Sequence, residues 1–446
     1  MDMNLFIDRV LASAKAAGIE TAEVYCESGE SFRASAMDGE INQYQVSSSA
    51  GLSLRGTVDG RMGYSATQAF DEAAVSQLIE GVKESAALVE SEEQDEIYAG
   101  DESYPEIPKA DSDLKDITPE QKLAMCLAME KAAKEADPRI WKVQRAMVST
   151  SGNTVRIKNS YGLDLTDSGA MWMAGTGPIA KEGDKTATGG WMAAGYRFAD
   201  LDPVAIGKKA TEETVCQLGG SPVPAGEYRI ILRFDAMQSL LQTFCGIFSA
   251  EVAQQNMSLL RGKEGEIIAS PAVTLMDDPL LPGGFGSQRF DAEGSASMTK
   301  AVIDAGVLTT LLHSRKTARK QGVKSTGNAS RGSYAAPVRV APTNLFFKAG
   351  EKSLDELMAD VGEGLVITDL AGLHSGANAI SGDFSLLSKG YTIEGGKRGR
   401  AVEQITIAGN FYEVLKSIVA FASDLDFSMG SIASPSVDVG TLKVSG

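Results

Sequence analysis

Apolar residues near the start of the chain recur at the spacing of a helix face. The positions in this first stripe are Phe6, Ile7, Val10, Leu11, Ala14 and Ala17. Gly18 follows the stripe, and glycine is the usual residue just beyond the end of a helix. A second stripe follows the N-cap residue Asp71 and comprises Val75, Leu78, Ile79, Val82 and Ala86. The pattern therefore predicts two amphipathic helices on either side of a different kind of segment.

Between these two stripes, β-forming and turn residues replace the helical periodicity. Asp38-Gly39 and Asp59-Gly60 are typical of tight hairpin turns. The strands that we expect lie at residues 22–28, 32–37, 41–48, 51–58 and 61–65. A helix, a run of antiparallel strands and a second helix predict an N-terminal α+β domain over residues 1–90.

An acidic segment follows this domain. Residues 90–116 hold eleven acidic and two basic residues, which favours an exposed linker. Thr118, Pro119 and Gln121 then form the start signal of a helix, because they combine an N-cap, a proline at the first helical position and a capping box. We expect this helix to run to about residue 136, where the Asp137-Pro138 step ends it.

Strand patterns return over residues 142–198, with turns expected at 151–153 and 159–162. A helix that begins at Asp202-Pro203 and ends near Gly219 completes this part. We assign the acidic linker, helix, strands and second helix to a central segment, residues 91–220, packed with the N-terminal domain.

The remaining residues, 221–446, read as one larger α+β domain rich in antiparallel sheet. It opens with a strand at 227–232, followed by a long, largely apolar helix that we expect from residue 236 to about 260. Many short strands and glycine turns follow from residue 276 onward. Shorter helices are expected near 317–321, 354–359 and 412–422. The predicted class of the whole chain is therefore α+β, with an N-terminal α/β portion whose antiparallel strands are flanked by helices.

Composition and charge narrow the classes of function. The net charge of −17 disfavours nucleic-acid binding, which depends on basic contacts to phosphates. The chain has no run of about 18 apolar residues and no apolar leader at its start, so we expect no membrane span, no secretory signal and a cytoplasmic location. The four cysteines are widely spaced, which argues against a disulfide framework or a zinc ribbon.

Chemistry-bearing residues are sparse. The two histidines, His313 and His374, lie far apart in the sequence, so no single helix can present a pair of imidazoles to a metal. The segment 373–384 is richer than its surroundings. Its candidate side chains are His374, Ser375, Ser381 and Asp383. They suit either a substrate groove with its own hydrolytic site or a glycine-supported structural loop, and loop chemistry favours the second.

Several short motifs occur in one order along the chain. They are GLSLRG at 51–56, GRMGYS at 60–65, DAEG at 291–294, GVL at 306–308, KSTGN at 324–328, HSG at 374–376, SGDF at 381–384, IAGN at 407–410 and the ending at 435–444. Together they resemble the TldD/PmbA family of peptidases along nearly the whole chain. The resemblance also brings the family's historical description as a modulator of DNA gyrase, which the acidic charge does not support as DNA binding.

The resemblance implies a zinc peptidase in which a helix of the catalytic subunit carries His-Glu-x-x-x-His and a later cysteine completes the site. In this chain Gln242, Thr243 and Ile247 stand at the corresponding positions, and residues 430–433 lack the cysteine. The chain therefore resembles the PmbA/TldE-type subunit, metallopeptidase-like but without the zinc motif. We expect no catalytic residue, no metal ligand and no cofactor of its own. Cys245, inside this helix, is interpreted as a core residue.

Three functions are consistent with these features. The leading hypothesis is the non-catalytic subunit of a TldD/TldE-like zinc metallopeptidase complex that processes or degrades small or unfolded peptides. A TldD-type partner would then supply the zinc. A self-sufficient peptidase or hydrolase with a site near His374 and Asp383 is an alternative, and a stand-alone homodimeric regulatory or binding protein is another.

Overall fold

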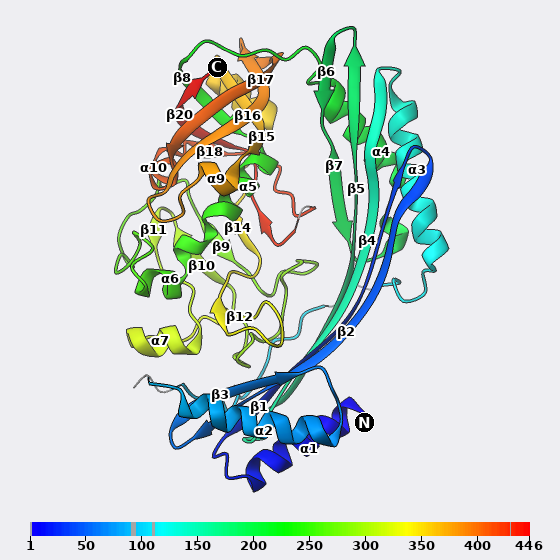
Figure 1. Ribbon diagram of the computed structural model, residues 1–446. Coiled ribbons are helices and arrows are strands. Elements are labelled where there is room, and N and C mark those ends of the chain that lie inside the picture. Colours follow the sequence, from blue (N-terminus) through cyan, green and yellow to red (C-terminus); the bar gives the residue numbers. More distant parts are fainter. Residues whose placement is uncertain (1, 91–94, 109–111, 429) are drawn as a thin grey trace.

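One long antiparallel sheet organises the N-terminal half of the molecule (Figure 1). The computed structural model describes residues 2–90, 95–108, 112–428 and 430–446. The strands of this sheet are β1 (Ala22–Met37), β2 (Glu40–Val58), β3 (Arg61–Thr67), β4 (Ile140–Asn159), β5 (Asp164–Glu182), β6 (Lys185–Thr188) and β7 (Trp191–Gly195). Their order is β3-β2-β1-β4-β5-β6, and β7 also pairs with β5. Strands from before and after the acidic segment thus form a single sheet.

Two pairs of helices cover the two ends of this sheet. Helices α1 (Met3–Ala16) and α2 (Glu72–Ala87) enclose one apolar core at the β3 end. Helices α3 (Pro119–Ala136) and α4 (Pro203–Val215) enclose a second core farther along the strands, and a short 3₁₀ turn, η1 (Phe198–Asp200), precedes α4. Asp71 caps α2 and Thr118 forms a capping box with Gln121, as local sequence signals predict. In Figure 1 these helix pairs lie at opposite ends of the curved strands.

The long strands run without the breaks that the sequence predicts. The turn expected at 151–153 is wrong, because these residues lie inside β4. Gly152 pairs with Glu30 of β1 on one side and with Ala170 of β5 on the other, so two ladders of hydrogen bonds hold it extended. Gly29 permits the close approach of the strands, since a Cβ atom there would lie 2.9 Å from the Gly152 carbonyl oxygen.

Two larger sheets and a two-stranded one form within the described residues of the C-terminal half. Its strands are β8 (Gly226–Leu232), β9 (Leu275–Asp277), β10 (Lys300–Asp304), β11 (Val307–Leu308), β12 (Ala329–Ser330), β13 (Arg339–Val340), β14 (Leu345–Phe347), β15 (Gly364–Ala371), β16 (Asp383–Glu394), β17 (Lys397–Asn410), β18 (Ala420–Phe421), β19 (Ile432–Ala433) and β20 (Val437–Ser445). The sheet orders are β17-β16-β15-β8-β20-β18, β11-β10-β9-β14-β19 and β12-β13. The predicted α+β class, rich in antiparallel strands, is confirmed.

The C-terminal half contributes the helices α5 (Phe234–Phe244), α6 (Ala250–Gln254), α7 (Arg315–Gln321), α8 (Leu354–Val361), α9 (Leu373–Gly376) and α10 (Phe411–Ser417), with the 3₁₀ turn η2 (Cys245–Phe248) between α5 and α6. The single helix expected over 236–260 is therefore wrong. Gly246 weakens the helix at its centre, and the extended Ser249 caps α6 with its hydroxyl. Helices α5, α6 and α10 contribute to one large apolar core, and α8 packs in a smaller one.

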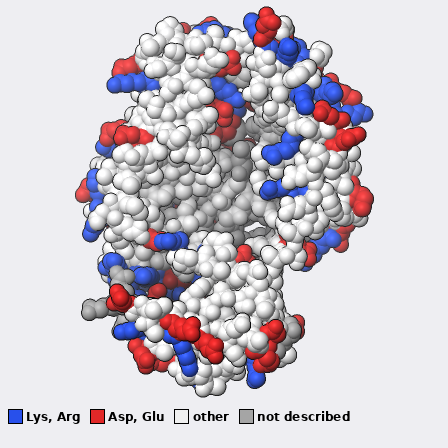
Figure 2. Space-filling model, in the orientation of Figure 1, with Lys and Arg blue, Asp and Glu red and all other residues white. Residues whose placement is uncertain are grey.

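The acidic segment between α2 and α3 contacts the C-terminal half. Residues 91–94 and 109–111 of the acidic stretch lie outside the described residues, and residues 95–108 form no helix or strand. Tyr104 donates a 2.8 Å hydrogen bond to the Gly294 carbonyl, and the Asp101 carboxylate accepts one from the Ala296 amide. The segment is thus tied to the C-terminal half along its described length. Figure 2 shows the molecule hollowed between the long sheet and the C-terminal half.

Candidate functional site

The two segments that the family resemblance associates with zinc lie next to each other. Helix α5 contacts β19, which runs parallel to β14. Yet the side chains there do not converge on a common point. Gln242 is exposed, the Thr243 hydroxyl donates a 2.8 Å hydrogen bond to the Ser239 carbonyl of its own helix, and Ile247 is 1% exposed within the apolar core. The arrangement offers hydrocarbon and an intrahelical hydroxyl where a metal would need imidazole or carboxylate.

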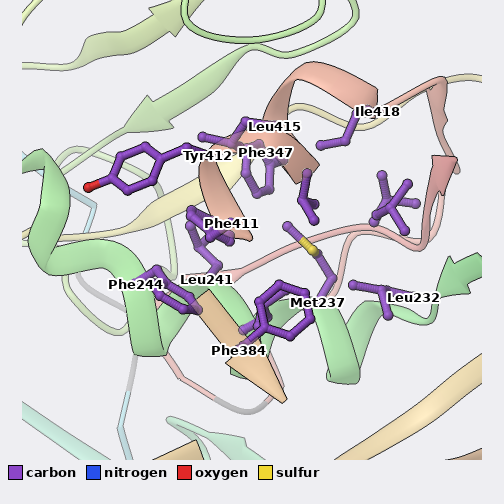
Figure 3. Packing of buried hydrophobic residues seen from close by; sticks show 14 of the residues in the cluster. Leu232, Met237, Leu241, Phe244, Phe347, Phe384, Phe411, Tyr412, Leu415 and Ile418 are labelled. Carbon is purple, nitrogen blue, oxygen red and sulfur yellow. The ribbon is translucent and has the colours of Figure 1, made fainter. Parts of the chain in front are cut away.

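Aromatic packing closes the region beneath α5. Phe244 stacks on Phe411 of α10 with ring centroids 4.7 Å apart and planes inclined by 8°, and Phe384 of β16 lies against it (Figure 3). Met237 and Leu241 of the same helix point into this cluster. Such packing excludes water and leaves no space for a substrate beneath the helix.

Cys245 is the one cysteine in residues 234–254, which contain no histidine. Its thiol donates to the Gln242 carbonyl at 3.2 Å, and burial raises its pKa to about 11. Burial thus disfavours the thiolate, which is the form that a metal binds. Across the described residues, no group of three or more His, Cys, Asp or Glu is placed to hold a metal ion. The residues around α5 do not fit zinc.

The structure brings together some of the candidate side chains in residues 373–384. The Ser381 hydroxyl donates a 2.8 Å hydrogen bond to Asp383, and the Asn410 side-chain amide donates another at 2.9 Å to the same carboxylate. These bonds, that of Asn410 first, lower the pKa of Asp383 below its usual range. His374 is exposed on α9 and is not among the hydrogen-bond partners of Asp383, while Ser375 donates weakly to the Gly372 carbonyl. The geometry thus pairs a serine with an acid but places no imidazole between them.

His313, by contrast, is 1% exposed. Its Nδ1 lies 3.2 Å from the Thr317 hydroxyl, and burial lowers the pKa of the imidazole. Both backbone groups of this residue also bond to Thr326 or its neighbours. These contacts are those of a structural core residue.

A second region, not singled out from the sequence, contains more ionisable chemistry. A cavity of about 1040 Å³ lies where the β2–β3 end of the long sheet meets α6, α7 and the segment around β12 and β13. We call it the interdomain cavity, and Arg55, Arg61, Tyr64, Glu293, Arg331 and Arg339 are among its lining residues. Direct contacts join the two halves beside it, including a 2.6 Å hydrogen bond from Tyr64 to the Tyr334 carbonyl.

Buried charges form one wall of the interdomain cavity. Arg55 is 5% exposed and its Nε donates a 2.7 Å hydrogen bond to Glu23, which is fully buried. The Arg331 side chain is 1% exposed, lies 3.8 Å from the same Glu23 oxygen and stacks over the ring of Tyr25 at 4.5 Å. Two guanidinium groups therefore share one carboxylate.

Two buried acids lie on the C-terminal side. Asp291 accepts backbone hydrogen bonds from Glu293, Ser295 and Ala329 at 2.9 to 3.1 Å, yet burial raises its pKa to about 7. Burial also raises the pKa of Glu293, although the Arg315 amide donates to it at 2.8 Å. Burial therefore favours the neutral form of both carboxyl groups, of which Glu293 lines the cavity.

Several residues that line this cavity belong to motifs of the sequence, but these motifs lie far apart along the chain. Arg55 belongs to the GLSLRG motif, Arg61 and Tyr64 to GRMGYS, and Glu293 to DAEG. The fold brings these three motifs to one cavity. Arg331 and Glu23 belong to none of them, and only the tertiary structure places these two beside Arg55.

Family models match most of the chain. Residues 22–86 match domain 1 of the PmbA/TldA metallopeptidases, residues 112–218 match their central domain, and residues 225–446 match their C-terminal domain. Among curated proteins, Metalloprotease PmbA of Escherichia coli O157:H7 is 25% identical over 98% of this chain and 94% of its own length. A metalloprotease of Methanothermobacter thermautotrophicus is 33% identical over a match that spans 50% of this chain and 49% of that protein.

Solved structures agree with the family models. A Thermotoga maritima protein described as a modulator of a DNA gyrase is 32% identical, with a TM-score of 0.92, and the match covers 99% of this chain and 100% of that one. TldE of Thermococcus kodakarensis has the same fold, with a TM-score of 0.90, 22% identity and coverage of 99% and 100%. The family resemblance is thereby confirmed, and the chain belongs to the PmbA/TldD metallopeptidase family.

Proposed function

We propose that this chain is the non-catalytic, PmbA/TldE-type subunit of a peptidase complex whose zinc centre belongs to a TldD-type partner. The observation that carries the proposal is the chemistry of α5. Gln242 and Thr243 supply an amide and an intrahelical hydroxyl, while Ile247 is buried in the core. None of these side chains is the imidazole or carboxylate that zinc binds in peptidases.

The shape of the molecule supports a role in handling extended peptides. The walls of the hollow in Figure 2 that face the viewer carry few charged residues. Residues 40–51 of β2 pair with β1 on one side, whereas β3 pairs with β2 only from Leu52 onward. Their other edge is therefore available for backbone hydrogen bonds to an added strand, a mode of recognition with little sequence specificity.

The proposal is tested by reconstitution. The purified chain, a TldD-type protein from the same organism and their mixture are each assayed for cleavage of an unfolded polypeptide, and each is analysed for zinc. We expect the chain alone to contain no stoichiometric zinc and to cleave nothing, while the mixture forms a complex that cleaves. Stoichiometric zinc and cleavage by the chain alone would overturn the proposal.

Two further measurements separate the alternatives. The variant Asp383→Asn should leave the activity of the complex unchanged, because Asp383 is engaged with Ser381 and Asn410. Loss of activity in that variant would favour a separate hydrolytic site at residues 373–384. Light scattering distinguishes the remaining alternative, since a stable homodimer that ignores the TldD-type protein favours a stand-alone binding protein.

A further inference from the structure

We propose that four methionines on the hollow-facing side of the long sheet contact the apolar side chains of an extended peptide in the hollow. They are Met147 of β4, Met171 and Met173 of β5, and Met192 of β7, and we call them the methionine face. The inference rests on the proposed peptide-handling role and deepens it, because it names the kind of side chain that this subunit would prefer and the residues that would select it.

Strand pairing places the four methionines at neighbouring positions on one face of the sheet. Met147 and Met192 both pair with Gly175, one from each side, while Met173 and Met171 precede Gly175 on β5 by two and four residues. Residues directly opposite across a pair, and residues two apart along a strand, share a face. A Cβ atom on Gly175 would lie 2.6 Å from Cγ of Met192, so the Met192 side chain covers that glycine.

The methionine face is turned away from the helices that cover the sheet. Alternate positions of the same strands, Val148, Trp172 and Ala174, pack with residues of α3 and α4 in one apolar core. Each of the four methionines is half-buried, yet in the described part of the chain none of them belongs to an apolar core or packs against one. Figure 1 shows α3 on the outer side of the sheet, so the opposite face is directed toward the C-terminal half and the hollow of Figure 2.

Methionine suits contact with apolar side chains of differing shape. Its unbranched side chain has three rotatable bonds and a polarisable thioether, so it adapts to the partner that it meets. Single exposed apolar residues are normal on a protein surface, whereas a group of them at neighbouring positions marks a binding surface. The methionine face therefore has the chemistry of a surface that accepts many apolar partners.

The position of this face favours an extended chain over a folded partner. It forms part of the wall of a hollow and not of an outer surface. Pairing connects Met173 through Ser149 and Arg33 to Gln45, which lies on the open edge of β2. A peptide that enters over this edge would pass one positive charge and otherwise uncharged polar groups before it reaches Met173. The weakly charged approach suits a chain whose side chains are apolar or neutral.

An aromatic contact bounds the other end of the face. Tyr196 follows Gly195, which pairs with Trp172, so it lies at the Met171 end of the face. Its ring stacks on Phe285 with centroids 5.2 Å apart, and its hydroxyl donates a 2.8 Å hydrogen bond to the Gly284 carbonyl. The glycine-rich turn of the C-terminal half thus contacts the sheet here, and the methionine face lies between this contact and the open edge of β2.

Binding of matched peptides by the purified full-length chain tests the assignment without a partner. A short fluorescein-labelled peptide of serine and glycine carries leucine at alternate positions, and its control carries asparagine there. Fluorescence anisotropy should show the leucine peptide bound at least about tenfold more tightly, because burial of its side chains supplies the difference. Methionine or phenylalanine in place of leucine should keep the affinity within about fivefold, since the face adapts to each shape. Equal binding of the leucine and asparagine peptides, or no binding of the leucine peptide, would overturn the proposal.

Substitutions then place the peptide on the sheet. Met173→Gln combined with Met192→Gln keeps the length of both side chains but makes them polar, and should weaken binding of the leucine peptide by at least about tenfold. Met257→Gln is the matched control, since Met257 is 38% exposed but follows α6 in the C-terminal half. Unchanged affinity in the double variant, or an equal loss in Met257→Gln, would contradict the assignment. Should the double variant not fold, the single variants decide, each with an expected loss of about threefold.

These outcomes are distinct from those of the reconstitution. A chain that binds no leucine peptide but still supports cleavage with the TldD-type protein would contradict the methionine face alone. A double variant that binds the leucine peptide normally but no longer forms the complex would make this face a subunit contact, and the assignment to peptide would be wrong.

Discussion

The surroundings of α5 and the interdomain cavity differ in almost every physical respect. Around α5 the side chains are hydrocarbon and aromatic, and Phe244, Phe384 and Phe411 fill the space beneath the helix. At the interdomain cavity, Arg55 and Arg331 lie buried beside Glu23, and each of the three side chains has one polar atom without a hydrogen-bond partner among the described residues. The residues buried around α5 pack as hydrocarbon, whereas those buried at the interdomain cavity carry charge.

This contrast separates family membership from chemistry. The fold places α5 beside β19, yet in the part of the chain that the structure describes no group of three or more His, Cys, Asp or Glu is placed to hold a metal ion. Meanwhile three motifs that carry the family resemblance meet at the cavity. Function in this chain is therefore better sought where its motifs converge than where the metal of its catalytic relatives would lie.

The largest effect is expected from forcing the metal motif back onto α5. Ile247→His should lower the free energy of unfolding by about 4 kcal/mol, because it removes buried hydrocarbon and places a polar ring in an apolar core. Urea denaturation measures the change. Gln242→His at the exposed position of the same motif is the control and should stay within about 0.5 kcal/mol. A stable double variant that binds zinc would show that the core around α5 can open, and the contrast would fail.

Local signals explain which parts of the fold the sequence predicts. Asp71, Thr118 and Gln121 act within a few residues of themselves, and each forms the predicted cap. The break between α5 and α6 could not be predicted from the sequence. Residues on both sides of Gly246 face one core, so the helical spacing of apolar residues continues through the break. The continuity of β4 could not be predicted for a related reason. Pairing with β1 and β5 holds the strand extended through its Ser-Gly-Asn segment, whose own residues favour a turn.

The same distinction between local signals and long-range contacts applies to the candidate sites. Segment 373–384 is visible in the sequence because its polar residues are adjacent, and the structure joins Ser381 to Asp383. The charged wall of the interdomain cavity is not visible, because Glu23, Arg55 and Arg331 come from distant parts of the chain. Only strand pairing and the meeting of two domains bring them together.

An intermediate effect is expected from removing the shared counterion of the cavity. Glu23→Gln should lower the free energy of unfolding by about 3 kcal/mol, since both buried guanidinium groups lose their compensating charge. The loss lies at the lower end of the range for broken buried ion pairs, because the glutamine oxygen can still accept a hydrogen bond from Arg55. Glu30→Gln, exposed on the same strand, is the control and should change little. An unchanged unfolding midpoint in Glu23→Gln would mean that the cluster is solvated, which would weaken the contrast with α5.

The smallest of the three effects is a pH dependence. The pKa of Asp291 is raised from 3.8 to about 7 by burial, so the folded state holds a proton that the unfolded carboxyl has already released. A raised folded pKa contributes stability that is fully present below about pH 4 and is lost as pH rises through about 7. Burial shifts the pKa of Glu293 in the same direction, which adds to the same trend.

Urea denaturation at about pH 5 and about pH 8 should therefore show a loss of roughly 2 kcal/mol on going to the higher pH. Asp291→Asn cannot titrate, so its stability should be lower at both values but should change less between them. Asp304→Asn, at an exposed position, should keep the wild-type slope. If Asp291→Asn also keeps that slope, other groups cause the dependence. Asp291 would then be ionised in the folded state already at about pH 5, despite its burial.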